Sequence, residues 1–241
     1  MKKILSLLLA LIMFVSTLAV LSSCGGDDTP DPEIPAVRYT VTEEEWISNM
    51  QAMNYTVKGK YINTDKFIFD NIASYSYGSI EMQMTDNAVY SHSEQQMYGY
   101  HEIKKTFQID NGEVCFNVYK NLYTGEYEAT EAYEYEWRVV SELIYMYGFD
   151  VDLEGGYSSF TYNEANKCYT FTYTYTDSHN DIVETQTHTV TFEFVDGKIS
   201  TMKIEKTREQ DDYIGTYIYD FTFTNVGTTK IDIPAYTVVG N

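Results

Sequence analysis

The sequence predicts a mainly β protein of the α+β class: a curved antiparallel sheet or incomplete β-barrel, with an N-terminal helix and a mid-chain helix packed on one face. Three observations support this fold class. Long segments alternate apolar and polar residues with a period of two, glycine-containing turns separate these segments, and only two stretches show helical spacing. Because no linker-like composition and no repeat occurs after residue 38, residues 39–241 are expected to form a single domain.

The first helix is expected to begin at Thr42. Thr42 and Glu45 have the spacing of a capping box, and Val41 and Trp46 occupy the two positions of a hydrophobic staple. An apolar stripe follows at helical spacing: Trp46, Met50 and Met53. This stripe predicts a helix packed on a sheet, and the alternative is that the same side chains line a ligand site.

The strands are predicted from segments in which every second residue is apolar. Clear examples begin at Ile80, Val114 and Val190. Glycine-containing turns lie between such segments: DNG at 110–112, YTGE at 123–126 and VDG at 195–197. An antiparallel meander follows from this pattern.

One interruption of the meander is expected, a mid-chain helix that ends at Gly148. Its apolar residues recur at helical spacing: Trp137, Val140, Ile144 and Tyr147. The start of this helix within residues 126–137 stays open, because the same letters also alternate as a strand.

Two of the predicted strands carry rows of aromatic residues on one face. In residues 168–177, CYTFTYTYTD, aromatic residues alternate with threonine, and residues 217–223 repeat the arrangement. Each buried ring is worth about 3 kcal/mol, so leaving both rows in water would forgo more than the net stability of a typical domain. Helices, the opposite wall of the sheet or a bound apolar ligand must cover them. The candidate ligand-binding residues are Trp46, Met50, Met53, Tyr169, Phe171, Tyr173, Tyr217, Tyr219, Phe221 and Phe223.

The beginning of the chain has the features of an export signal. Two lysines precede a long uncharged apolar run, and small residues then lead to a cysteine. Leu21, Ser22, Ser23 and Cys24 resemble the lipobox of bacterial lipoproteins. The resemblance implies cleavage before Cys24 and acylation of its thiol, and an uncleaved membrane span is the alternative.

With cleavage before Cys24, the chain is predicted to consist of a signal peptide at residues 1–23, an acidic Pro/Gly tether at 24–38 and the β-rich domain at 39–241. The resemblance to the lipobox predicts a protein of the bacterial cell envelope that is lipid-anchored outside the cytoplasm, in the cell membrane or the outer membrane.

The order of elements after the tether resembles the LolA-like and LppX-like lipoprotein superfamily. Those proteins place a helix first, then a long antiparallel sheet curled into an incomplete barrel, with a helical segment over its concave side. Residues 219–234, YDFTFTNVGTTKIDIP, are similar to the end of many such chains: an aromatic strand, a turn with Gly227 and a short strand stopped by Pro234. The resemblance implies a hydrophobic cavity for acyl chains. Here the aromatic face is rich in tyrosine, whose hydroxyls need partners when buried, which favours a smaller or more polar ligand, or none.

Charge and motifs argue against several functional classes. The formal net charge is −20, which repels phosphate backbones and anionic head groups, so no nucleic-acid partner is expected and the membrane is reached through the lipid. No nucleophile elbow, phosphate loop or zinc motif occurs, and the four histidines are scattered and interpreted as surface or edge residues. Residues 150–156, DVDLEGG, imitate half of an EF-hand loop, but Thr161 stands where the bidentate acid belongs. We therefore expect no enzyme, no metal and no cofactor.

Two cysteines remain beside Cys24. Cys115 and Cys168 both have the non-aromatic parity of their strands, so their thiols would share a face if the strands share a sheet. A disulfide between them and two free thiols are the alternatives.

Three functional hypotheses follow. The first is a non-catalytic binding or carrier protein for a hydrophobic or amphipathic ligand, such as a small molecule or lipid, which predicts a cavity. The second is a cell-surface interaction module that binds a glycan or a protein through an exposed tyrosine-rich sheet. The third is a structural envelope lipoprotein with a filled core.

Overall fold

The computed structural model describes residues 36–70, 72–97, 99–132, 140, 141, 143, 156–179 and 182–239. Residues 37–241 form one compact unit, whose described part is mainly β. The predicted fold class is confirmed to that extent, and the sheet does not close into a barrel. No helix among the described residues is long and apolar enough to cross a membrane.

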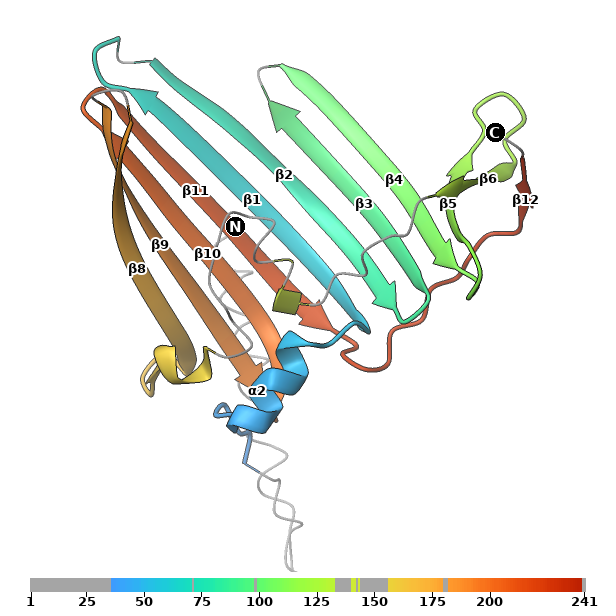
Figure 1. Cartoon of the computed structure of the whole chain (residues 1–241), viewed down its shortest axis with the longest axis horizontal. Helices are drawn as coiled ribbons and strands as arrows, with labels where there is room; N and C mark the ends of the chain where they lie inside the picture. The colour runs from blue at the N-terminus through green and yellow to red at the C-terminus, as the bar shows by residue number, and fades with distance from the viewer. Residues whose placement is uncertain are drawn as a thin grey trace, which may run out of the picture. The chain divides into compact units, whose positions relative to one another are not determined.

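A single twelve-stranded sheet dominates this unit. The elements in sequence order are α2 (Glu43–Met50), β1 (Tyr55–Phe67), β2 (Ile72–Thr85), β3 (Ala88–Met97), β4 (Tyr100–Asp110), β5 (Cys115–Lys120), β6 (Tyr127–Ala132), the 3-10 turn η1 (Tyr157–Ser159), β7 (Thr161–Asn163), β8 (Cys168–His179), β9 (Ile182–Val195), β10 (Lys198–Gln210), β11 (Tyr213–Thr224) and β12 (Tyr236–Val238). Across the sheet the order is β12-β6-β5-β4-β3-β2-β1-β11-β10-β9-β8-β7 (Figure 1).

The end of the chain departs from the predicted meander. Residues 229–235 lie outside the strands, so the short strand expected before Pro234 is absent there. The last strand, β12, follows Pro234 and pairs with β6 in parallel, whereas every other pair of neighbouring strands is antiparallel. The sheet is therefore mixed. The aromatic strand and the turn with Gly227, whose φ is +79°, are present as predicted.

The N-terminal helix begins as the sequence predicts. The Thr42 hydroxyl accepts a hydrogen bond from the Glu45 N–H at 3.2 Å, and the Glu45 carboxylate accepts one from the Thr42 N–H at 2.9 Å. Arg38, predicted as the last residue of the tether, belongs to the folded unit, because its guanidinium pairs with Glu45 and its N–H donates to Asp196. The helix ends at Met50, so Met53, which was predicted to belong to its apolar stripe, lies outside the helix.

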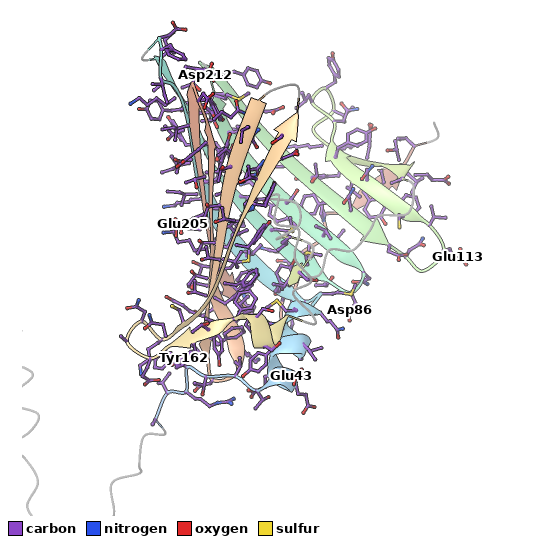
Figure 2. The ribbon with its side chains drawn as sticks, turned by 60° about the vertical axis from the view of Figure 1, so that its left-hand side comes forward. Glu43, Asp86, Glu113, Tyr162, Glu205 and Asp212 are labelled. Carbon is purple, nitrogen blue, oxygen red and sulfur yellow. The ribbon has the colours of Figure 1, made fainter. Side chains whose placement is uncertain are left out.

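The two faces of the sheet carry separate hydrophobic cores. We call the face covered by α2 face A and the opposite face, from which Glu205 projects in Figure 2, face B. The first core lies on face A, where Trp46 and Met50 pack on apolar residues of β1, β2 and β8–β11. The second core lies on face B over β4–β6: Ile109, Phe116, Val118 and Ala129, with Tyr236 packed against them. The apolar residues thus change faces across the sheet.

This change of face overturns the disulfide hypothesis. Phe116 faces B, so its neighbour Cys115 faces A, whereas Tyr169 faces A and Cys168 faces B. Seven strands separate β5 from β8, which is about 38 Å at the usual strand spacing. Both thiols are buried and free. The parity argument is wrong because it assumed that the apolar side of every strand shares one face.

Part of the predicted mid-chain helix can be compared with the structure. Val140, Ser141 and Leu143 are helical, and Val140 and Leu143 are buried in the first core. Trp137, Ile144 and Tyr147 lie outside the described residues. The lipobox and the acidic residues of the 150–156 loop lie outside them as well.

Candidate functional site

Face A changes character along its strands, as rows of residues paired across β2, β1, β11, β10, β9 and β8 show. The first row, at the edge of the core, is Gly78, Tyr61, Tyr219, Ile204, Val190 and Phe171, of which Ile204 and Val190 belong to the core. The second is Ser76, Asn63, Tyr217, Lys206, His188 and Tyr173. The third is Ser74, Asp65, Gly215, Arg208, Gln186 and Tyr175. An aromatic and aliphatic surface thus gives way, within two rows, to a polar and charged one.

The end of face A nearest α2 is filled. The indole of Trp46 lies 4.7 Å from the Phe160 ring and 5.2 Å from the Phe192 ring, measured between centroids, and Trp46 is completely buried. Of the predicted ligand-binding residues, five therefore belong to the packed core: Trp46, Met50, Tyr169, Phe221 and Phe223. Their aromatic side chains cover one another, so this end of face A stabilises the fold and leaves no room for a ligand.

The remaining predicted residues lie in two places. Phe171, Tyr173, Tyr217 and Tyr219 are partly buried and stay together on face A beyond the core. Met53 is separate from them, because it lines a hollow of about 600 Å³ beside the end of α2. The structure therefore brings four of the ten predicted residues into one surface outside the core.

Aromatic rings lie flat on this part of the sheet because glycines leave room for them. A Cβ atom at Gly78 would approach Cε1 of Tyr61 to 2.6 Å, and one at Gly59 would approach Cδ1 of Phe221 to 2.5 Å. Aromatic side chains that cover strand glycines in this way stabilise a sheet at positions that lack a side chain of their own. These rings form a thin aromatic layer on face A, which we call the aromatic floor, and the polar rows follow directly beyond it.

Two tyrosines and one carboxylate form the first part of the polar surface. The Tyr217 hydroxyl donates to Oδ1 of Asp65 at 2.9 Å, Tyr213 also donates to Oδ1, and the two hydroxyl oxygens are 2.7 Å apart. They meet above Gly215, where a Cβ atom would lie 2.5 Å from the Tyr213 hydroxyl. Burial raises the pKa of Tyr213 and Tyr217, and the Asp65 carboxylate adds to this effect, so both hydroxyls keep their protons at neutral pH.

An ion pair forms the second part. Arg208 Nη2 lies 2.6 Å from Oε2 of Glu184, and Arg208 Nε donates to Oε1 at 3.1 Å. Gln210 donates to the same carboxylate at 2.6 Å. The hydrogen bonds from Arg208 are the largest cause that lowers the pKa of Glu184 to about 2, so the carboxylate is ionised and fully paired at neutral pH.

Lys206 and His188 lie between the aromatic floor and this ion pair. His188 is 1% exposed and its ring stacks on Tyr173 with centroids 4.8 Å apart, which corrects its interpretation as a surface or edge residue. Burial lowers the pKa of His188 to about 4, and the charge of Lys206 adds to this, so the imidazole is neutral at neutral pH. Burial and the charge of Arg208 lower the pKa of Lys206.

The polar residues of this surface were not predicted from the sequence. Lys206 and Arg208 have the same parity as Met202 and Ile204, which are buried in the core. A run of charged residues that continues the apolar parity of one strand was the signal that could have revealed them. Asp65 has the parity of Tyr61 and could have been found in the same way.

The other candidate sites gain no support. Among the residues that the structure describes, no three of His, Cys, Asp and Glu gather as metal ligands. Two pairs of acidic residues could be considered as the paired carboxylates of a glycosidase: Asp211 and Asp212 lie in the turn between β10 and β11, and Glu134 and Glu136 lie outside the described residues.

Comparison with known proteins does not assign a family. No protein-family model matches the chain, and no curated protein matches it.

Proposed function

We propose that this protein is a non-catalytic binding or carrier protein that holds an amphipathic ligand along face A. The observation that supports this function is the continuity of one partly exposed surface: the aromatic row with Tyr61, Tyr219 and Phe171 runs directly into the row with Tyr217 and Lys206. A ligand with an apolar part and a polar end matches both rows at once.

The physical basis is the partial burial of the aromatic row. Burial raises the pKa of Tyr61 and Tyr219, so their hydroxyls are protonated and the rings present apolar surface with a hydrogen-bonding tip. Covering such rings with an apolar chain removes more of their surface from water, at about 25 cal/mol per Å². The polar row then fixes the orientation of the ligand.

Attachment to the bacterial envelope belongs to the same proposal. The lipobox-like residues before Cys24 and the acidic tether that follows support a lipid-anchored protein outside the cytoplasm. A helix before a long β-sheet, with the helical residues Val140 and Leu143 packed in the same core as α2, is compatible with the LolA-like carriers that the sequence resembles.

A binding measurement tests the function. Residues 24–241 with Cys24→Ala are titrated with dodecyl maltoside below its critical micelle concentration, by calorimetry. We expect saturable binding that Tyr61→Ala weakens about tenfold, because a ring contact is lost. Tyr77→Ala, a matched change on face B, is the control. Absence of binding, or equal loss with both variants, contradicts the proposal.

A second candidate function rests on face B. Ile62 is 55% exposed and Tyr77 is 50% exposed, and the two lie opposite each other on β1 and β2. Tyr75, at 61%, lies two residues along the same strand. Exposed aromatic and aliphatic residues grouped in this way favour a surface that binds a glycan or a protein. Loss of partner binding on Tyr75→Ala, with face A binding intact, would favour this alternative.

A further inference from the structure

Within the proposed function, we propose that the ligand is an amphipathic anion, whose acidic head group pairs with the Lys206 ammonium while its apolar part lies on the neighbouring aromatic row. This assignment holds only if face A binds an amphipathic ligand. The head group is identified by its chemistry, as a carboxylate, phosphate or sulfate.

The first support is the position of Lys206. It lies on β10, directly opposite Tyr217 of β11 on one side and His188 of β9 on the other, and it is only partly exposed. The adjacent residue on the same face toward the core is Ile204, which is fully buried. The ammonium therefore stands at the boundary between the apolar and polar parts of face A, where the head group of an amphipathic ligand would fall.

The second support is the balance of charges around it. Arg208 is neutralised by Glu184, and Asp65 accepts hydrogen bonds from Tyr213 and Tyr217. Lys206 has no ion-pair partner among the carboxylates that the structure describes. His188 is a neutral imidazole at neutral pH, so it adds no charge of its own beside Lys206. Within this cluster, the Lys206 ammonium is the charged group that makes no direct ion pair or hydrogen bond to another described side chain.

The third support is the cost of the unpaired charge. Burial and the nearby Arg208 both disfavour the charged form of Lys206, and the charge of Glu184 offsets them only in part, which is why the pKa of Lys206 is lowered. An anion at this place would relieve both effects, and a hydrogen bond between two ionised groups is stronger than one between neutral groups. A cationic head group would instead add a third positive charge beside Lys206 and Arg208.

The geometry also accommodates the apolar part. Residues two apart on a strand are about 7 Å apart on the same face, so a chain of several carbons extends from Lys206 over the row that holds Ile204 and Tyr219.

The experiment compares three amphiphiles with one chain length. Residues 24–241 with Cys24→Ala are titrated with dodecyl phosphate, dodecyl maltoside and dodecyltrimethylammonium, each below its critical micelle concentration. We expect dodecyl phosphate to bind at least about tenfold more tightly than the other two. Lys206→Met, which keeps the length of the side chain, should remove this advantage and leave maltoside binding unchanged, whereas Lys206→Arg should retain it.

Lys203 supplies the matched control. It lies on the same strand but on face B, where it pairs with Glu205 at 2.9 Å, so Lys203→Met should leave all three affinities unchanged. If Lys206→Met does not fold, the salt dependence of dodecyl phosphate binding by the unsubstituted chain decides: weaker binding at high salt supports the ion pair. Equal binding of the three amphiphiles overturns the anion assignment while the proposed function stands, and absence of all binding overturns both.

Discussion

Gly59 illustrates how single residues shape the aromatic floor of face A. Its missing side chain leaves room for the Phe221 ring, which would lie 2.5 Å from a Cβ atom, and for Ile80, whose Cγ2 would lie at 3.0 Å. We expect Gly59→Ala to lower the free energy of unfolding by about 1–3 kcal/mol, because the ring must move in a packed core. Urea unfolding measures this.

The partner of Gly59 supplies the control for this prediction. In a Phe221→Leu background the same Gly59→Ala change should cost clearly less, since the smaller side chain leaves space for the new methyl group. Additive effects of the two substitutions would contradict the contact.

Glu184 makes stability depend on pH. Its pKa is lowered to about 2 in the folded protein, chiefly by hydrogen bonds from Arg208, and an unfolded glutamate titrates at about 4.3. A carboxylate with a lowered folded pKa adds stability that is complete above the unfolded pKa and is lost as the pH falls toward the folded pKa. The difference in unfolding free energy between the unsubstituted chain and Glu184→Gln should therefore be largest at pH 6 and should shrink as the pH falls to 2.5.

The control for this pH effect lies on the same strand. Glu193 is exposed on face B, so Glu193→Gln should show no comparable convergence. A difference between Glu184→Gln and the unsubstituted chain that stays constant from pH 6 to pH 2.5 would argue against the ion pair.

At the level of elements, α2 depends on its cap and on the side chains that it packs against the sheet, Trp46 and Met50. The helix has eight residues, which is too short to be stable alone, so the Thr42 cap and the packing of Trp46 hold it on the sheet. Thr42→Ala should cost about 1 kcal/mol of unfolding free energy, whereas Thr42→Ser should cost little because the hydroxyl remains. Equal unfolding midpoints for Thr42→Ala and the unsubstituted chain would show that the cap is dispensable.

The elements also show what could be predicted from the sequence. The cap of α2, the aromatic rows of β8 and β11 and the glycine turns depend on neighbouring residues, so local patterns were sufficient for them. The change of face at β4–β6 could not be predicted from local patterns. Alternation shows which residues share one side of a strand, but it does not show which face of the sheet that side belongs to. The prediction that Met53 lies on the helix was wrong for a similar reason, since helical spacing alone did not reveal that the helix ends at Met50.

The candidate site divides in the same way. Its aromatic residues could be predicted from the alternation in the sequence. Half of the predicted ligand-binding residues lie in the packed core, however, and the sequence could not show this, because it does not reveal which end of the sheet Trp46 covers. The polar residues come together from β1, β9, β10 and β11, which are distant in sequence, and so their contacts required the sheet order.

For the whole molecule, the strand order predicts the state of the cysteines. Cys115 and Cys168 lie on opposite faces with seven strands between their own, so they cannot reach disulfide distance without unfolding. Denaturation of the Cys24→Ala chain in iodoacetamide without reductant should label both thiols, as intact mass spectrometry would show. An unlabelled chain that becomes labelled only after reduction would contradict the sheet order.

The central claim, that an amphipathic ligand lies along face A, is tested most directly by photo-crosslinking. A dodecyl phosphate analogue with a diazirine in its alkyl chain is irradiated with the protein, and the labelled residues are mapped by peptide mass spectrometry. We expect labels on the face A residues of β8, β10, β11 and β1, with Tyr173, Tyr219 and Tyr61 among them. Unlabelled dodecyl phosphate should reduce this labelling by competition. Labels concentrated on Ile62, Tyr75 and Tyr77 of face B would contradict it.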